Sequence, residues 1–326
     1  MALNWEDGGI RYGAQQQQKW KTKMYVLKFG HRYKSTLLLC FLLFSLTGYA
    51  QNYSDLVALD GYKTKVYFSK GNDERAKIVT ARMDNVLEFY NKVIEYEPEV
   101  TLLILNPEDW PKHTTFPIYG MPHYDDKREL LIIASEDNDF WRSFIPPVDL
   151  LPKELADKIK IIYVDNSGDL TMQAFFDLLA IHEIGHAYHF QAGINVQRMW
   201  MGELFCNILL HTYIAENEPE QLPALTIFPQ MVIAGGTEGY KYTSLNDIEE
   251  RYEEIGSMHP KNYGWFQCRW HYEAGNIYDA GGTNTFIKLW NAFSEQKEKL
   301  NDEDLAVFLS EKVHKSASDV MLKWDE

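Results

Sequence analysis

The chain has 326 residues, 45% of them hydrophobic and 24% charged, which is typical of a packed globular protein and argues against disorder. Its formal net charge of −15 disfavours binding to nucleic acid or to an anionic membrane surface. Three cysteines are too few for a scaffold that depends on disulfides. The length allows one large domain or two modest ones.

The first 50 residues predict export. Residues 1–23 are polar and stop before Met24, an alternative start, so they carry no information about the fold. After Met24 a basic segment is followed by the apolar run 36–46 and then by Gly48 and Ala50, the positions that a signal peptidase reads. The apolar run is shorter than the roughly 20 residues of a spanning helix. We therefore interpret residues 1–50 as an N-terminal extension and signal peptide.

Cleavage after Ala50 would leave 25 Lys and Arg against 45 Asp and Glu, so the net charge would become about −20. We expect the mature protein to be periplasmic or extracellular, without a stable membrane anchor and without a nucleic acid partner. Cys206 and Cys268 would remain. They form either a single disulfide or two buried thiols.

Two regions follow the signal segment, at residues 51–168 and 169–326. In the first, apolar runs at 65–68, 100–105 and 130–134 predict strands, and helical spacing predicts a helix at 76–94. The second is nearly all helical, with candidates at 171–191, 198–216, 244–254, 262–279, 284–293 and 302–313. These patterns predict an α+β fold in which an α/β lobe packs on a helical lobe, with the active site in a cleft between them.

The segment 182–186 reads His-Glu-Ile-Gly-His and carries the clearest chemical signal. His182 and His186 are four residues apart, so on a helix both imidazoles project from one face and can share a zinc ion. Glu183 flanks that face, where a carboxylate can take a proton from a zinc-bound water without ligating the metal. The segment therefore predicts a zinc centre with Glu183 as general base.

A catalytic zinc needs a third protein ligand, and two residues lie close enough in sequence. His189 is too far along the same helix from His182, at about 10 Å, so we expect it to pack beside the site. Glu203 fits better, because a turn at 193–196 would bring a returning helix back level with His186. Glu203 also lies in an apolar run, where a lone charge would need a partner. We predict Glu203 as the third ligand.

The sequence resembles the gluzincin metallopeptidases, which include thermolysin-like and aminopeptidase-like proteins. The resemblance rests on His-Glu-Ile-Gly-His, on the downstream Glu203 and on Trp200 three residues before that glutamate. The close similarity covers residues 175–210. It implies a zincin-like fold, a zinc cofactor and hydrolysis of peptide bonds. The chain departs from the pattern in its shorter interval from His186 to Glu203. It also has Asn207 where many members carry an acid that orients the first histidine.

Such chemistry also needs a donor for the oxyanion of the tetrahedral intermediate. Four aromatic side chains beyond the third ligand are candidates: Tyr263, His271, Tyr272 and Tyr278. Tyr263 resembles the tyrosine that begins the corresponding helix in aminopeptidase-like relatives. His271 resembles, by interval, the histidine of thermolysin-like ones. For each of these side chains the alternative is a packed core residue.

A peptide or protein substrate would add as a strand to a sheet edge. The stretch 119–124 predicts such an edge, since its Pro122 is tolerated there. No glutamate follows Met121 to hold a substrate's amino terminus, so the sequence does not favour an aminopeptidase.

The predicted function is a secreted zinc-dependent metallopeptidase. The alternative is an exported binding or surface protein that keeps the fold without turnover, an interpretation that the short ligand interval and Asn207 leave open. A structural zinc module is disfavoured, because structural sites usually close their coordination sphere with several thiolates.

We predict that the mature protein begins near Gln51, because Gly48 and Ala50 end the apolar run behind a basic segment. N-terminal sequencing of exported material tests this. Secreted protein that still carries Cys40 would contradict it.

Overall fold

The computed structural model describes residues 53–165 and 167–326, so the predicted signal peptide and its cleavage site lie outside the described residues. In the described part the fold is mixed α+β, with a five-stranded sheet in the N-terminal part of the chain and mostly helices after it. Contacts group Leu56–Glu326 into one compact unit. None of the helices described is both long and apolar enough to cross a membrane.

The sheet has the strand order β1-β2-β3-β5-β4. Its strands are β1 (Val57–Leu59), β2 (Lys65–Phe68), β3 (Thr101–Leu105), β4 (His123–Asp125) and β5 (Leu130–Ala134). β2, β3 and β5 run parallel, and β1 and β4 are antiparallel edges. β5 and nearly all of β3 are buried, as expected for central strands covered on both faces. The three strands predicted from apolar runs are confirmed, and β4 overlaps the end of the predicted edge segment.

The helices of the N-terminal part are α2 (Asp73–Ile94), the short α3 (Trp110–His113) and α4 (Asp139–Arg142), and α5 (Lys153–Ile162). Those that follow are α6 (Gln173–Ala192), α7 (Met199–Asn217), α8 (Leu222–Ala234), α9 (Leu245–Met258), α10 (Pro260–Gly281), α11 (Thr283–Glu295), α12 (Asp302–Lys312) and α13 (Lys315–Leu322). Short 3-10 turns lie at Val148–Leu150 and Pro219–Gln221. Every helix predicted from periodicity is present, with its ends displaced by a few residues.

The sequence did not predict α5, α8 or α13. α8 shows why, because it is apolar on nearly all sides and contains Pro229 within its span. Proline removes a backbone donor and usually ends a helix, so the segment resembles a loop between helices. Here packing against α10 and α7 holds the helix together despite the lost hydrogen bond.

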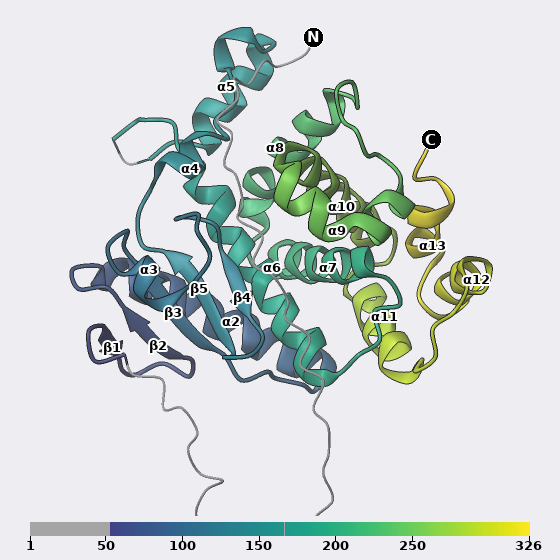
Figure 1. Ribbon diagram of the computed structural model, residues 1–326, viewed down its shortest axis with the longest axis horizontal. Coiled ribbons are helices and arrows are strands. Elements are labelled where there is room, and N and C mark those ends of the chain that lie inside the picture. Colours follow the sequence, from purple (N-terminus) through teal and green to yellow (C-terminus); the bar gives the residue numbers. More distant parts are fainter. Residues whose placement is uncertain (1–52, 166) are drawn as a thin grey trace, which may run out of the picture. The chain divides into compact units, whose positions relative to one another are not determined.

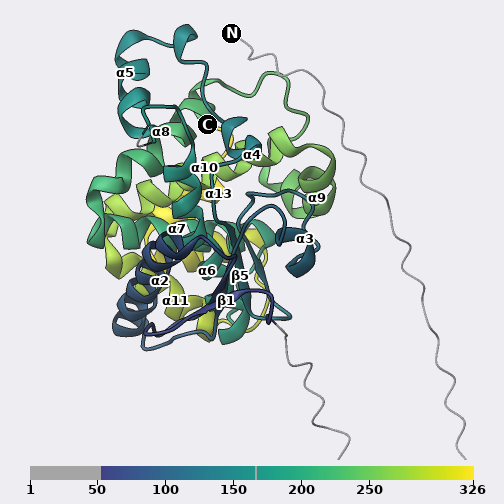
Figure 2. The same ribbon diagram turned by 90° about the vertical axis from the view of Figure 1, so that its left-hand side faces the viewer.

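Helix α6 lies between the sheet and helix α7 (Figure 1). Figure 2 shows the same arrangement from the side. One side of α6 contacts β4 and β5, and another packs on α7. Arg75 on α2 forms an ion pair with Asp177 on α6, and Tyr90 on α2 donates a hydrogen bond to the carbonyl of Leu209 on α7 at 2.5 Å. The position of α6 is therefore fixed from both the sheet and the helical part.

Helices α6 and α7 form a tight antiparallel hairpin. α6 ends at Gly193, whose left-handed conformation (φ 59°) lets its amide close the last turn on the carbonyls of His189 and Phe190. α7 is buried all round from Trp200 to Ile214, as expected for a helix in the core.

At Gly185 the two helices approach so closely that a Cβ atom there would lie 2.9 Å from the Cα, Cβ and Sγ atoms of Cys206. The glycine of the His-Glu-Ile-Gly-His segment therefore sets the contact between α6 and α7. The backbones can meet this closely only because no side chain separates them.

We expect Gly185→Ala to lower the free energy of unfolding by about 1–3 kcal/mol, the usual cost of overpacking, because the new methyl group meets the backbone of α7. Gly264→Ala on α10 is the matched control. No atom lies within 4 Å of its added Cβ, so alanine should leave stability unchanged or raise it by up to about 1 kcal/mol. Urea unfolding of the variants measures both effects. Equal stability of the wild type and Gly185→Ala would contradict the proposed role of this contact.

Candidate metal centre

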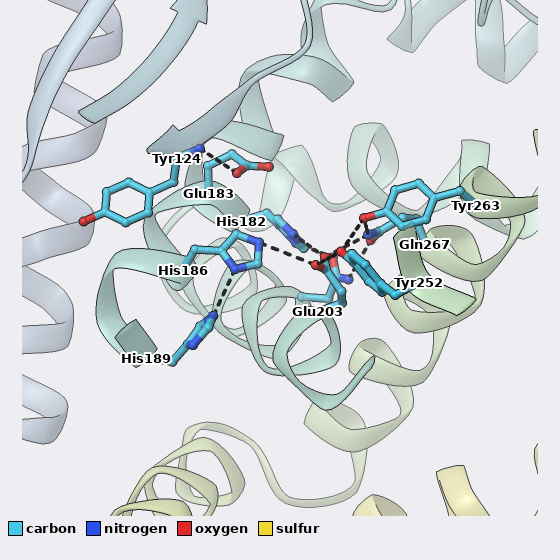
Figure 3. Close-up of polar contacts among 10 residues, drawn as sticks. Tyr124, His182, Glu183, His186, His189, Glu203, Tyr252, Tyr263 and Gln267 are labelled. Carbon is cyan, nitrogen blue, oxygen red and sulfur yellow. Dashed lines mark hydrogen bonds and ion pairs between the residues drawn. The ribbon is translucent and has the colours of Figure 1, made fainter. Parts of the chain in front are cut away.

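The predicted ligands come together across the α6–α7 hairpin (Figure 3). His182 and His186 lie one turn apart on α6, and Glu203 faces them from α7. The distance from His182 Nε2 to Glu203 Oε2 is 3.2 Å, and that from His186 Nε2 to Glu203 Oε1 is 3.8 Å. Each imidazole therefore directs its Nε2 atom toward the same carboxylate.

The Nδ1 atoms of both histidines have other partners. His182 Nδ1 lies 3.0 Å from Asn207 Oδ1, and His186 Nδ1 lies 2.9 Å from His189 Nε2. Asn207 lies one turn after Glu203 on α7, and its hydrogen bond holds the ring of His182 in one orientation. His189 lies behind His186 and does not face Glu203. These partners leave the two Nε2 atoms as the ones that can bind a metal ion.

The surroundings of Glu203 fit a bound cation. Its side chain is buried, with the residue 6% exposed, and no lysine or arginine of the described residues pairs with it. Burying a carboxylate costs several kcal/mol unless it is compensated. Hydrogen bonds from Tyr252 (2.5 Å, to Oε1) and Gln267 (2.8 Å, to Oε2) compensate it in part. Two imidazole lone pairs beside a buried carboxylate form a donor set that suits zinc.

Cys206 is a second candidate for the third ligand. Among the described residues, the ligand atoms of His182, His186 and Cys206 lie within 4.8 Å of one another. Burial together with the charges of Glu203 and Glu183 raises the pKa of Cys206 well above its usual value. Glu203 already places its carboxylate oxygens 3.2 Å and 3.8 Å from the two Nε2 atoms. We therefore favour Glu203.

In the described part Cys206 and Cys268 are both free and buried, so of the two predicted states they are two buried thiols and not a disulfide.

The protonation of the metal-free site follows from burial and from the partners of each group. Burial lowers the pKa of His186 to about 4, so this imidazole is neutral and its lone pair is free. Burial also opposes the charged form of His182, but its hydrogen bond to Glu203 and the charge of that carboxylate raise its pKa overall. When no metal is bound, the raised pKa favours a proton on His182, which then donates to the Glu203 carboxylate and offsets its charge.

Glu183 lies beside the predicted ligands and not among them. Its Oε2 accepts a hydrogen bond from the backbone N–H of Tyr124 on edge strand β4, at 3.0 Å (Figure 3). Burial raises the pKa of Glu183 to about 7, with the neighbouring His182 opposing the shift. A carboxylate with a pKa near neutrality can both take up and release a proton under physiological conditions.

The four candidate oxyanion donors occupy different surroundings. Tyr263 lies near Glu203, because its hydroxyl is 2.9 Å from that of Tyr252 and accepts from Gln267 Nε2 at 2.8 Å. The ring of His271 lies 6.3 Å from that of His182 and makes no hydrogen bond with any described residue. Tyr272 is exposed, and Tyr278 donates to Glu216 at the surface. Of the four, only Tyr263 is linked by hydrogen bonds to the predicted ligands in the described part.

Sequence reasoning missed Tyr252 and Gln267, which hold Glu203. The helical spacing of Gln267, four residues after Tyr263, places both on one face of α10 and could have identified it. No such signal existed for Tyr252. It follows a kink in α9 at Arg251 (φ −129°, ψ 26°), which breaks the periodicity that would otherwise predict its direction.

Neither a scan against protein-family models nor a search of curated proteins finds a match for this chain. The assignment of the centre therefore depends on its residues and their geometry.

We expect Tyr252→Phe to weaken zinc binding about 10-fold to 100-fold, because it removes the hydroxyl that donates to Glu203 and orients it. Competition with a chelating dye measures the affinity. Tyr242→Phe is the matched control, since it deletes a similar bond to Glu254 (2.6 Å) away from the predicted ligands. The proposed role of Tyr252 would be wrong if both variants bound zinc as tightly as the wild type.

Proposed function

We propose that this protein is an exported zinc-dependent peptidase of the gluzincin type, with a zincin-like fold. One observation carries the proposal. The imidazoles of His182 and His186 direct their Nε2 atoms at the buried carboxylate of Glu203, and the carboxylate of Glu183 lies beside them. His182, His186 and Glu203 would hold the metal. Zinc bound there would supply a Lewis acid that lowers the pKa of a water molecule and polarises the substrate carbonyl.

Glu183 is the proposed general base. It accepts the proton of the attacking water and then donates it to the leaving amine, and a pKa of about 7 suits both transfers. The backbone N–H of Tyr124 donates to one carboxylate oxygen and keeps the side chain in place. The other oxygen has no partner among the described residues and remains free to accept the proton.

Tyr263 is the proposed source of oxyanion stabilisation, because the neighbouring Tyr252 already donates its one hydroxyl proton to Glu203. Their hydroxyls lie 2.9 Å apart, and one of them already donates to Glu203. Burial and the charge of Glu203 raise the pKa of both phenols, so both keep their protons, and Tyr263 remains the donor for a substrate oxyanion. A donor that is already in place stabilises developing negative charge without reorganising during the reaction.

The substrate is proposed to be an extended peptide that adds to β4. This strand pairs with β5 on one side only, and the N–H of Tyr124 on its other side points to Glu183. Phe190, 54% exposed, stacks on the ring of His186 at 6.0 Å between centroids and offers an apolar surface to a substrate side chain. Both features lie beside the predicted ligands.

We expect Glu183→Gln to lower peptidase activity at least ~10²-fold, because the amide keeps size and hydrogen bonding but cannot accept the proton. Zinc content should not change, since Glu183 is not a ligand. Cleavage of a broad peptide library by the zinc-loaded protein measures activity, and mass spectrometry measures the metal. Glu74→Gln, at an exposed carboxylate on α2, is the matched control.

Equally fast, chelator-sensitive cleavage by the wild type and Glu183→Gln would contradict the role of Glu183. A wild type that holds zinc but cleaves no peptide would favour the alternative, an exported binding protein that retains the fold.

A further inference from the structure

The edge strand β4 can offer a substrate only a short stretch of main chain. It has three residues, and all three pair with β5 on one side. In an antiparallel pair, each residue directs both its N–H and its C=O either to the partner strand or away from it. The N–H of Tyr124 donates to Glu183 and so points away from β5, and the C=O of Tyr124 faces the same way. Of the three β4 residues described, Tyr124 is therefore the one that presents its main chain to the metal centre.

The side chain of Tyr124 is held separately by α6. Its ring turns away from Glu183 and the predicted ligands (Figure 3). Its hydroxyl accepts a hydrogen bond from Gln191 Nε2 at 2.8 Å. Gln191 lies in the last turn of α6, and its distance from Glu183 along the helix is about 12 Å. Tyr124 is therefore tied to α6 at two separate points, by its main chain to Glu183 and by its hydroxyl to Gln191.

Gln191 makes two further hydrogen bonds, both to main-chain groups of Glu99. Its Oε1 accepts from the N–H of Glu99 at 2.8 Å, and its Nε2 donates to the C=O of Glu99 at 2.7 Å. Glu99 lies in the segment between α2 and the central strand β3. A carboxamide has two N–H donors, so the bonds to Glu99 and Tyr124 use both of them. We call Glu99, Gln191 and the hydroxyl of Tyr124 the strand clamp.

The strand clamp fixes β4 relative to α6. A three-residue edge strand has few bonds to hold it, and segments with few bonds open at a small cost in free energy. A strand that has moved must be ordered again when a substrate binds, and this ordering opposes binding. The bonds of the strand clamp keep β4 ordered before a substrate arrives.

We propose that Gln191 is a positioning residue for peptide binding and that it acts through Tyr124. By holding the Tyr124 side chain, it keeps the C=O of this residue in place to accept a hydrogen bond from a substrate N–H beside the metal centre. This role rests on the peptidase function proposed above. The clamp itself does not touch the reacting atoms, because the hydroxyl of Tyr124 points away from them.

The test uses two variants that break the same hydrogen bond. Tyr124→Phe removes the hydroxyl and keeps the ring, and Gln191→Met removes the carboxamide and keeps a chain of similar length. For the library peptide that the wild type cleaves fastest, we expect each variant to raise KM about 3-fold to 10-fold, the usual effect of losing one hydrogen bond. We expect kcat to stay within about 2-fold, because the bound substrate orders β4 before the chemical step.

The double variant separates positioning from two unrelated effects. Because both changes act through one bond, Tyr124→Phe combined with Gln191→Met should raise KM no more than Gln191→Met alone. Tyr242→Phe is the matched control. It deletes a hydroxyl that bonds to Glu254 on α9 at 2.6 Å, and it should leave KM unchanged.

Hydrogen exchange tests the same role without catalysis. In the wild type the amide at position 124 is protected by its hydrogen bond to Glu183. We expect this amide to exchange about 3-fold to 10-fold faster in Tyr124→Phe and in Gln191→Met, and at the wild-type rate in Tyr242→Phe. Nuclear magnetic resonance of the labelled protein measures the rates.

Unchanged exchange at position 124 in both variants would overturn the proposal, whether or not the wild type cleaves peptides. Faster exchange with an unchanged KM would also overturn it, because the strand clamp would then hold β4 without affecting the substrate. A zinc-loaded wild type that cleaves no peptide would count against the proposed function. The exchange rates alone would then decide whether the strand clamp holds β4.

Discussion

The close approach of α6 and α7 at Gly185 and Cys206 is the constraint on which the rest of the centre depends. Because Gly185 has no side chain, the two backbones meet directly, and this contact sets the register of the hairpin. In that register Glu203 lies opposite both His182 and His186. One turn further along α7, Asn207 reaches the first histidine. Any side chain at position 185 would push α7 away and move the Glu203 carboxylate away from the imidazoles of His182 and His186.

The register has an electrostatic cost, because it buries the Glu203 carboxylate in the helical core. Desolvation of such a group costs several kcal/mol, and each hydrogen bond to it restores about 1.5–3 kcal/mol. Tyr252, Gln267 and His182 all bond to it, so the protein alone compensates part of this cost. Their positions hold the carboxylate in one orientation toward the Nε2 atoms. The same arrangement that compensates the buried charge would also hold the carboxylate in place for the proposed cation.

Further polar side chains lie along the contact between α7 and α10. Core helices normally exclude polar groups, yet here Gln267, His271 and His211 follow one another through the core. Near Glu203 each polar group has a protein partner. Farther along the contact, His211 and His271 line a pocket of about 100 Å³ between α7, α8 and α10.

The sequence alone determined the features that follow from local periodicity. Helical spacing placed His182 and His186 on one face, and the short turn after α6 brought Glu203 level with them. The apolar runs 65–68 and 130–134 matched β2 and β5. Only the tertiary structure decided the rest. Tyr252 follows a kink and lies 49 residues from Glu203, and the amide of Tyr124 reaches Glu183 across 59 residues. Such contacts depend on how separate elements pack, and packing leaves no periodic signal in the chain.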